Sequence, residues 1–223
     1  MSRIRGGAID DLLAAKAPPP ARETIEDGAM LLRGFAAAEE AALWAAVEDV
    51  VRQAPFRNMV TPGGFRMSVA MTNCGAAGWI TDRRGYRYER IDPETGRPWP
   101  AMPPLFHGLA ARAALAAGFA DFVADACLVN RYEPSARMTL HQDKNERDFS
   151  QPIVSISLGL PAIFLFGGEK RSNRPRRFRL ASGDVLVWGG PARLRFHGIE
   201  KLLADEAAGA SACRINLTLR KAL

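Results

Sequence analysis

Cysteine is scarce in this chain of 223 residues, and its spacing excludes two common uses of that residue. The three cysteines, Cys74, Cys127 and Cys213, are an odd number and contain no C-x-x-C pair. Neither a disulfide framework nor a cysteine-based zinc site is therefore indicated. We expect the protein to occupy a reducing compartment.

Long apolar runs and glycine-rich phosphate loops are also missing. No apolar stretch approaches the ~18 residues that a membrane-spanning helix needs, and residues 1–21 lack the apolar centre of a signal peptide. Neither G-x-x-x-x-G-K-[ST] nor G-x-G-x-x-G occurs, which argues against nucleotide binding by such a loop. We expect a cytoplasmic protein without a membrane partner.

The order of predicted elements indicates one mainly β domain with flanking helices. Residues 1–22 are rich in Ala and Pro and are expected to form a flexible tail, leaving 23–223 as a single domain. Helical spacing predicts helices at about 36–53 and 105–117, and residues 55–100 suggest hairpins that form a lid. Strands are predicted at 127–132, 138–142, 153–159, 163–166, 177–180, 185–188, 194–196 and 215–219. About eight strands fit a double-sheet jelly roll, with its core at about 125–220.

Two histidines and a carboxylate form the most informative motif. His141 and Asp143 are two residues apart, so on a strand their side chains point the same way, and His197 follows later in Arg-Phe-His-Gly. Two His and one carboxylate can occupy one face of an octahedral Fe(II) and leave three positions open. The alternative is a hydrogen-bonded His-Asp pair and a separate core histidine.

The last strand carries an unusual set of polar residues. Arg214, Asn216, Thr218 and Arg220 alternate with apolar residues and share one face. Arginines on an inward face are costly to bury without an anionic partner, so a dicarboxylate ligand such as 2-oxoglutarate would explain them. The alternative is a basic strand that faces solvent. Asn130 and Tyr132 also share a strand face and could complete the same pocket.

Several stretches in one order carry a resemblance to a known family. The chain is similar to the AlkB-type Fe(II)/2-oxoglutarate dioxygenases, which reverse alkylation damage in nucleic acids. The resemblance covers residues 28 to 220 and rests on residues 55–64 (PFRNMVTPGG), 67–78 (MSVAMTNCGAAG), 98–103 (PWPAMP), 130–132 (NRY), 140–144 (LHQDK), 153–168 and 214–220. The combination of H-x-D, a distant His and R-x-N-x-x-x-R in this order is specific evidence for the resemblance, whereas H-x-D alone is weak.

The resemblance implies a double-stranded β-helix fold, a chemistry and a set of site residues. It implies an iron site at His141, Asp143 and His197, which are also the catalytic residues. It implies a 2-oxoglutarate site at Asn130, Tyr132, Arg214, Asn216 and Arg220. It also implies O2 as co-substrate and oxidative demethylation of 1-methyladenine and 3-methylcytosine by a monomer, with formaldehyde, succinate and CO2 released. The expected substrate is single- or double-stranded DNA, or RNA.

The resemblance further implies substrate contacts at Thr61, Trp79, Tyr86 and Arg171. One position departs from the family pattern: where the bacterial member carries an aspartate two residues after the iron aspartate, this chain has Asn145. An amide accepts hydrogen bonds but carries no charge to favour a cationic methylated base. The preference among lesions is therefore expected to differ.

Charge distribution favours a nucleic acid as the substrate. The formal net charge is +6, and residues 170–179 carry six basic residues and no acidic one. A second cluster at 83–88 interleaves Arg with Tyr, a composition suited to phosphates and stacked bases. Two alternatives remain: a related oxygenase acting on tRNA or a protein side chain, and a nucleic-acid-binding module without chemistry.

Overall fold

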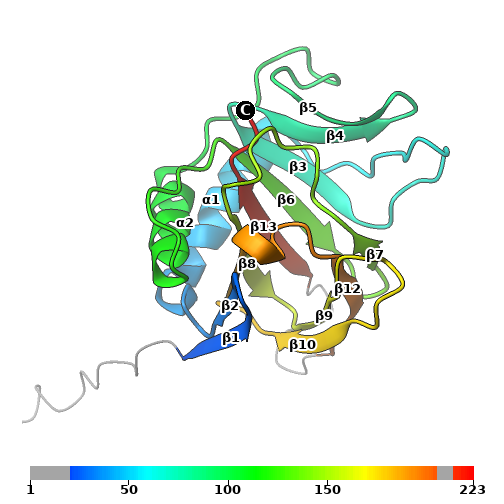
Figure 1. Cartoon of the computed structure of the whole chain (residues 1–223). Coiled ribbons are helices and arrows are strands. Elements are labelled where there is room, and N and C mark those ends of the chain that lie inside the picture. The colour runs from blue at the N-terminus through cyan, green and yellow to red at the C-terminus, as the bar shows by residue number, and fades with distance from the viewer. Residues whose placement is uncertain (1–20, 205–212) are drawn as a thin grey trace, which may run out of the picture.

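Two antiparallel sheets face each other and enclose the centre of the molecule (Figure 1). The structure is a computed structural model that describes residues 21–204 and 213–223. The larger sheet contains, in spatial order, β1 (Arg22–Glu26), β2 (Ala29–Leu32), β11 (Val185–Trp188), β8 (Ile153–Gly159), β13 (Arg214–Arg220), β6 (Ala126–Tyr132) and β3 (Ala70–Gly75). The smaller sheet has the order β10 (Arg176–Leu180), β9 (Ala162–Phe166), β12 (His197–Leu202) and β7 (Met138–His141).

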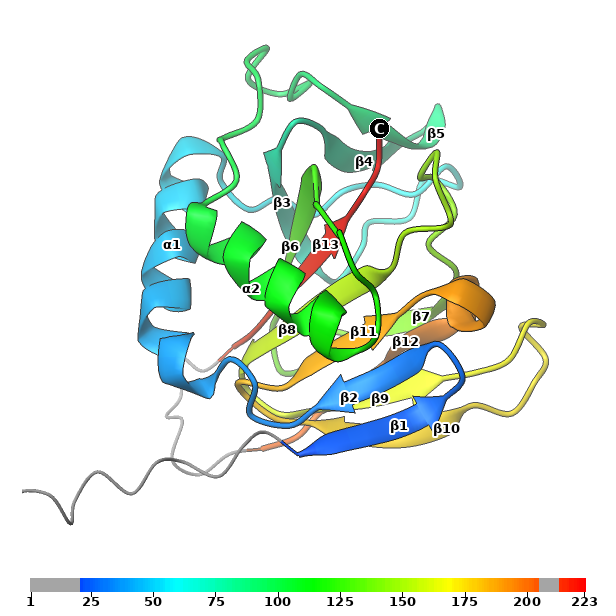
Figure 2. The same ribbon diagram turned by 60° about the vertical axis from the view of Figure 1, so that its left-hand side comes forward.

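A separate hairpin and two helices complete the described part of the fold. The hairpin pairs β4 (Gly78–Asp82) with β5 (Gly85–Glu89) and lies above the opening between the sheets. Helices α1 (Glu40–Gln53) and α2 (Pro104–Ala116) cover the outer face of the larger sheet (Figure 2). Short 3-10 turns occupy Ala37–Glu39 and Gly190–Ala192. No helix among the described residues is long and apolar enough to cross a membrane.

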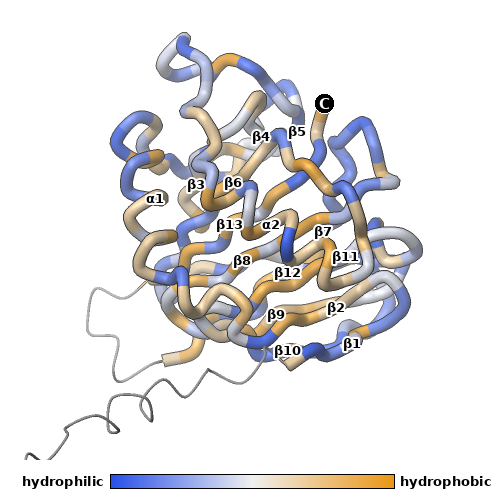
Figure 3. Tube along the Cα trace, turned by 90° about the vertical axis from the view of Figure 1, so that its left-hand side faces the viewer, coloured by the Kyte–Doolittle hydropathy of each residue, from blue (hydrophilic) through white to orange (hydrophobic). Residues whose placement is uncertain are grey.

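The larger sheet is buried on both faces by two separate apolar cores. One core joins α1 and α2 to the outward side chains of the sheet, including Leu43, Phe106 and Leu217. The other core lies between the sheets and includes Phe164 and Trp188. Figure 3 shows the apolar colour along the inner strands and the hydrophilic colour in the loops around them. The sheets are therefore held by apolar burial on both sides, which leaves one region between them for polar groups.

The predicted jelly roll is confirmed. Eight strands, β6 to β13, lie between residues 126 and 220. The second predicted helix forms within one residue of its expected bounds, whereas the first begins four residues late, at Glu40, because a 3-10 turn occupies Ala37–Glu39. Strand β13 shows the predicted alternation, and all seven of its residues are buried, so the alternative of a basic strand that faces solvent is wrong. The reason is that α1 and α2 cover its apolar side.

Two local predictions were wrong. The strand expected at 194–196 is absent: Arg195 N donates to Ala192 O in a turn, and the strand begins at His197, where pairing with His141 starts. The motif H-x-D does not lie on one strand either, because β7 ends at His141 and Asp143 belongs to the following loop. Residues 1–20 of the expected tail lie outside the described residues, and Arg22 already begins β1.

The close approach of β8 to the chain before β13 depends on a glycine. Gly159 has φ +75°, and a Cβ there would overlap the carbonyl oxygen of Cys213, which accepts a hydrogen bond from Leu160 N.

We expect Gly159→Ala to lower the free energy of unfolding by about 2–4 kcal/mol, since it adds steric overlap to left-handed strain. Gly34→Ala is the matched control, because Gly34 has φ +62° with open space around it. It should lose only about 1 kcal/mol. Urea unfolding measures both, and equal losses would contradict the overlap argument.

Candidate metal and co-substrate site

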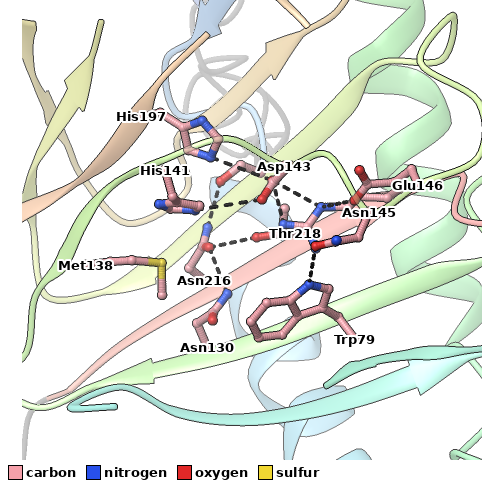
Figure 4. Close-up of polar contacts among 12 residues, drawn as sticks. Trp79, Asn130, Met138, His141, Asp143, Asn145, Glu146, His197, Asn216 and Thr218 are labelled. Carbon is pink, nitrogen blue, oxygen red and sulfur yellow. Dashed lines mark hydrogen bonds and ion pairs between the residues drawn. The ribbon is translucent and has the colours of Figure 1, made fainter. Parts of the chain in front are cut away.

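Two strands and one loop bring His141, Asp143 and His197 together inside the cavity between the sheets (Figure 4). His141 ends β7 and His197 begins β12, and the two residues are direct partners in the antiparallel ladder. His141 Nε2 lies 3.7 Å from Asp143 Oδ1, and His197 Nε2 lies 3.6 Å from Asp143 Oδ2. Three donor atoms at this spacing can bind one metal ion from the same side.

Backbone carbonyls orient both imidazoles toward such an ion. His141 Nδ1 lies 2.9 Å from the carbonyl oxygen of Thr139, and His197 Nδ1 lies 3.0 Å from that of Arg195. A carbonyl only accepts, so each Nδ1 carries the proton and each Nε2 keeps its lone pair free as a ligand atom. Burial, together with the neighbouring His197, lowers the pKa of His141 to about 4, so the ring is neutral near pH 7.

Asp143 is held as a carboxylate by an arginine. Arg220 Nη2 donates to Asp143 Oδ2 at 2.6 Å, and Arg220 Nε donates to the same oxygen at 3.1 Å. Burial opposes ionisation of Asp143, but the positive charge of Arg220 and contact with His197 hold its pKa well below the usual value. Asp143 therefore presents a permanent negative charge to a cation.

At the opposite end of β13, Arg214 is fully buried and has no carboxylate partner within residues 21–204 and 213–223. Its Nη2 donates to Ser157 Oγ at 2.8 Å, and its Nε has no hydrogen-bond partner among the described residues. Burial lowers the pKa of Arg214 to about 10, which still leaves the group charged near pH 7. A buried guanidinium with an unpartnered nitrogen matches a ligand carboxylate, which it can bind in bidentate fashion.

The floor of the cavity between the two arginines is a set of fixed amides and hydroxyls. Asn216 Nδ2 donates to Ser155 Oγ at 2.7 Å, while Asn216 Oδ1 accepts from Thr218 Oγ1 at 2.9 Å and from Asn130 Nδ2 at 3.3 Å. Asn130 Oδ1 is buried without a partner among the described residues. Tyr132 lines the same space, and burial raises the pKa of its hydroxyl, so that it remains a donor. The residues present fit a small dicarboxylate such as 2-oxoglutarate beside a divalent metal ion.

The hairpin supplies the upper wall of the same cavity, which has a volume of about 520 Å³. Trp79 and Tyr86 are stacked with ring centroids 5.7 Å apart, and Trp79 Nε1 donates to Asn145 Oδ1 at 3.1 Å. Thr61 and Arg171 also line the cavity. All thirteen residues predicted from sequence therefore line one cavity: Thr61, Trp79, Tyr86, Asn130, Tyr132, His141, Asp143, Asn145, Arg171, His197, Arg214, Asn216 and Arg220.

Three polar residues near Asp143, two of them buried and one half-buried, were not identified from the sequence. They are Tyr88, Glu146 and Arg193, which contact one another or Arg220. Of the three, only Tyr88 had a sequence signal, because it shares strand parity with Tyr86. Glu146 and Arg193 lie in loops and turns, where periodicity is uninformative.

Comparison with known proteins places the chain among oxygenases. A sequence model of the 2OG-Fe(II) oxygenase superfamily matches residues 28–220. The chain is 56% identical over 203 residues to the alpha-ketoglutarate-dependent dioxygenase AlkB of Escherichia coli (strain K12), covering 91% of this chain and 94% of that protein. It is 37% identical over 106 residues to the nucleic acid dioxygenase ALKBH1 of Homo sapiens, covering 47% of this chain and 27% of that protein. The solved structure of OsALKBH1 superposes on this chain with a TM-score of 0.76 and 28% sequence identity, and the match covers 90% of this chain and 100% of that chain.

The jelly roll with a His-Asp-His group in its cavity defines an Fe(II)/2-oxoglutarate-dependent oxygenase. Fe(II) is the metal of this class, and 2-oxoglutarate and O2 are its co-substrates. Within that class, the chain belongs to the AlkB family of dioxygenases.

The buried positive charge of Arg214 leads to a prediction about the binding of 2-oxoglutarate. We expect Arg214→Ala to weaken binding of 2-oxoglutarate by about 2–5 kcal/mol, roughly 30-fold or more, because the ligand carboxylate loses its buried partner. Calorimetric titration of Mn(II)-loaded protein measures this. Arg112→Ala is the control, since Arg112 is exposed on α2 and pairs only with Glu39 among the described carboxylates. A dissociation constant within about threefold of the unsubstituted protein would contradict the pocket.

Proposed function

We propose that the protein demethylates N-alkylated bases, 1-methyladenine and 3-methylcytosine, in DNA or RNA. The observation that carries the proposal is one continuous cavity with the stacked pair Trp79 and Tyr86 at its upper wall and the His-Asp-His group below. A planar base can stack on aromatic rings in such a cavity while its methyl group points to the metal. Similarity to the Escherichia coli dioxygenase and the human nucleic acid dioxygenase supports a nucleic acid substrate.

In the proposed mechanism the protein supplies binding, orientation and charge. His141, Asp143 and His197 would hold Fe(II) through two Nε2 atoms and a carboxylate. Arg214 would bind the far carboxylate of 2-oxoglutarate. Fe(II) with 2-oxoglutarate supplies activation of O2, of which one oxygen atom ends in succinate, with CO2 released, and the other oxidises the N-methyl group, which leaves as formaldehyde.

The target base must leave the nucleic acid stack to reach this cavity. Unstacking costs least in a single strand or at a damaged pair, and Trp79 and Tyr86 compensate by stacking on the extruded base. Asn130, Tyr132, Asn216 and Arg220 would complete the 2-oxoglutarate site, and Thr61, Asn145 and Arg171 would contact the substrate. We assign residues 23–223 to one domain with a lid at 55–100.

Exposed basic residues, of which Arg171 lines the cavity, support binding of a phosphate backbone. All six basic residues of the 170–179 segment are exposed: Lys170, Arg171, Arg174, Arg176, Arg177 and Arg179. Arg177 is paired with Glu200, and on the hairpin Arg87 is paired with Asp82 and Glu89. Arg83 and Arg84 are exposed on the same hairpin. Exposed positive charge in these two segments favours a nucleic acid over a protein side chain as substrate. We propose that the protein acts as a monomer in the cytoplasm, where reducing conditions preserve Fe(II) and free thiols.

Turnover of defined oligonucleotides tests the function. Protein reconstituted anaerobically with Fe(II) and 2-oxoglutarate, then exposed to air, should remove about 14 mass units (CH2) from single strands carrying 1-methyladenine or 3-methylcytosine, with matching succinate. His141→Ala should abolish turnover while nucleic acid binding persists, and chelation of iron should do the same reversibly. Succinate without change in any base would redirect the assignment to tRNA or a protein side chain. Absence of succinate would leave a binding module.

Asn145 generates a prediction about lesion preference. Its amide accepts from Trp79 Nε1 but adds no charge to the cavity. We expect Asn145→Asp to raise kcat/KM for cationic 1-methyladenine relative to neutral 3-methylthymine by roughly tenfold, since one negative charge nearby is worth about 1–2 kcal/mol after screening. Competition between the two lesions in one reaction measures the ratio. The unsubstituted protein is the matched reference, because an aspartate at this position still accepts from Trp79 Nε1 and differs mainly in charge. Asn145→Ala removes that contact without adding charge, and equal ratios in the two variants would contradict the prediction.

A further inference from the structure

The iron carboxylate lies in a loop, so strand pairing does not determine its position. Residues 142–149, which we call the metal loop, follow β7 and contain no helix or strand. Two buried arginines hold Asp143 instead. Arg193 Nη1 donates to the backbone carbonyl of Asp143 at 2.8 Å, and Arg220 Nη2 donates to its side chain at 2.6 Å. The geometry of the carboxylate therefore depends on what fixes these two guanidinium groups.

Glu146 contacts both of them. Its side chain is only 1% exposed, although it belongs to no metal cluster among the described residues. Glu146 Oε2 lies 3.1 Å from Arg193 Nη2, and Glu146 Oε1 lies 3.4 Å from Arg220 Nε. A buried carboxylate is costly unless it is paired, and here both of its oxygens face the arginines that hold Asp143.

The charges of this cluster balance only when Glu146 is included. Asp143 and Glu146 carry two negative charges, and Arg193 and Arg220 carry two positive charges. Without Glu146 the cluster would hold one excess positive charge beside the position of a divalent cation. Glu146 therefore lowers the electrostatic cost of binding a metal ion, in addition to fixing the guanidinium groups.

Tyr88 extends the cluster to the hairpin. Its hydroxyl donates to Glu146 Oε1 at 2.7 Å and accepts from Arg220 Nη1 at 3.2 Å. Burial raises the pKa of Tyr88 well above the usual value, so the proton needed for donation to Glu146 is retained. Tyr88 is also the cross-strand partner of Trp79, whose indole donates to Asn145. The hairpin thus contacts two consecutive residues of the metal loop, Asn145 and Glu146. Figure 4 shows the first of these contacts, between Trp79 and Asn145.

We propose that Glu146 and Tyr88 are positioning residues that link the β4–β5 hairpin to the Asp143 carboxylate through Arg220 and Arg193. Metal binding at Asp143 then restrains the hairpin that carries Trp79, and restraint of the hairpin strengthens metal binding by the same factor, because coupling between two sites is reciprocal. The inference rests on the proposed metal site and extends it to the wall that receives the base.

Metal affinity is the first test, with Mn(II) as probe in the presence of 2-oxoglutarate, followed by electron paramagnetic resonance of free Mn(II). We expect Glu146→Gln to weaken Mn(II) binding about 10- to 100-fold, because substitution of residues that hydrogen-bond to and orient metal ligands commonly has an effect of this size. Tyr88→Phe should weaken it roughly three- to tenfold, since one hydrogen bond to a charged group is lost. Arg87→Gln is the hairpin control: it removes ion pairs to Asp82 and Glu89 but no contact to the cluster, and affinity should stay within about twofold.

Hydrogen exchange of the hairpin separates linkage from general destabilisation. Mn(II) with 2-oxoglutarate should slow amide exchange in residues 78–89 of the unsubstituted protein, and this slowing should be lost in Tyr88→Phe, which keeps the aromatic ring and its packing. The proposal would be overturned by unchanged Mn(II) affinity in both variants, or by amide exchange rates in the hairpin that are the same with and without Mn(II). Either result would leave the demethylase assignment intact. If the unsubstituted protein binds no Mn(II), the metal site itself is wrong, and the linkage with it.

Discussion

Two guanidinium groups buried on the inner face of one central strand determine how the cavity is organised. Arg214 and Arg220 begin and end β13, which lies between β8 and β6 in the larger sheet. Removing such charges from water is unfavourable unless negative groups accompany them. The protein provides Asp143 for Arg220 and no carboxylate among the described residues for Arg214. At one end of the cavity, beside the histidines, the charge of Arg220 is consequently neutralised by Asp143. At the other end the positive charge of Arg214 has no such counterpart and suits a ligand carboxylate.

Much of this arrangement could be predicted because it follows local periodicity. Polar residues at every second position of β13 had to share a face, and Asn130 and Tyr132 followed the same rule on the adjacent strand β6. Apolar runs of five to seven residues between turn signals predicted the strands of the jelly roll. The pairing of His141 with His197 was not visible in the spacing itself, and resemblance to a family supplied it.

What could not be predicted depends on contacts between residues far apart in the chain. Tyr88 is 58 residues from Glu146 and 132 residues from Arg220, and no pattern near any of them indicates the contact. Asp143 lies near the histidines because a loop places it there, not because of the strand parity that suggested it. The apolar residues Leu194 and Phe196 resembled a strand, yet Leu194 lies in a turn and is 40% exposed, and no strand begins before His197. Turn geometry after Pro191 prevailed over local β propensity there.

The position of β7 has a consequence for the solution behaviour of the protein. It is an edge strand of the smaller sheet, only four residues long, and β12 is its one neighbour in the ladder. Exposed strand edges offer free backbone groups to other chains. A metal ion bound as proposed by His141 and His197 would clamp this edge strand to β12, so part of the free energy of metal binding becomes folding free energy. Removal of the metal would therefore loosen the smaller sheet at the edge strand that borders the cavity, without unfolding the rest of the jelly roll first.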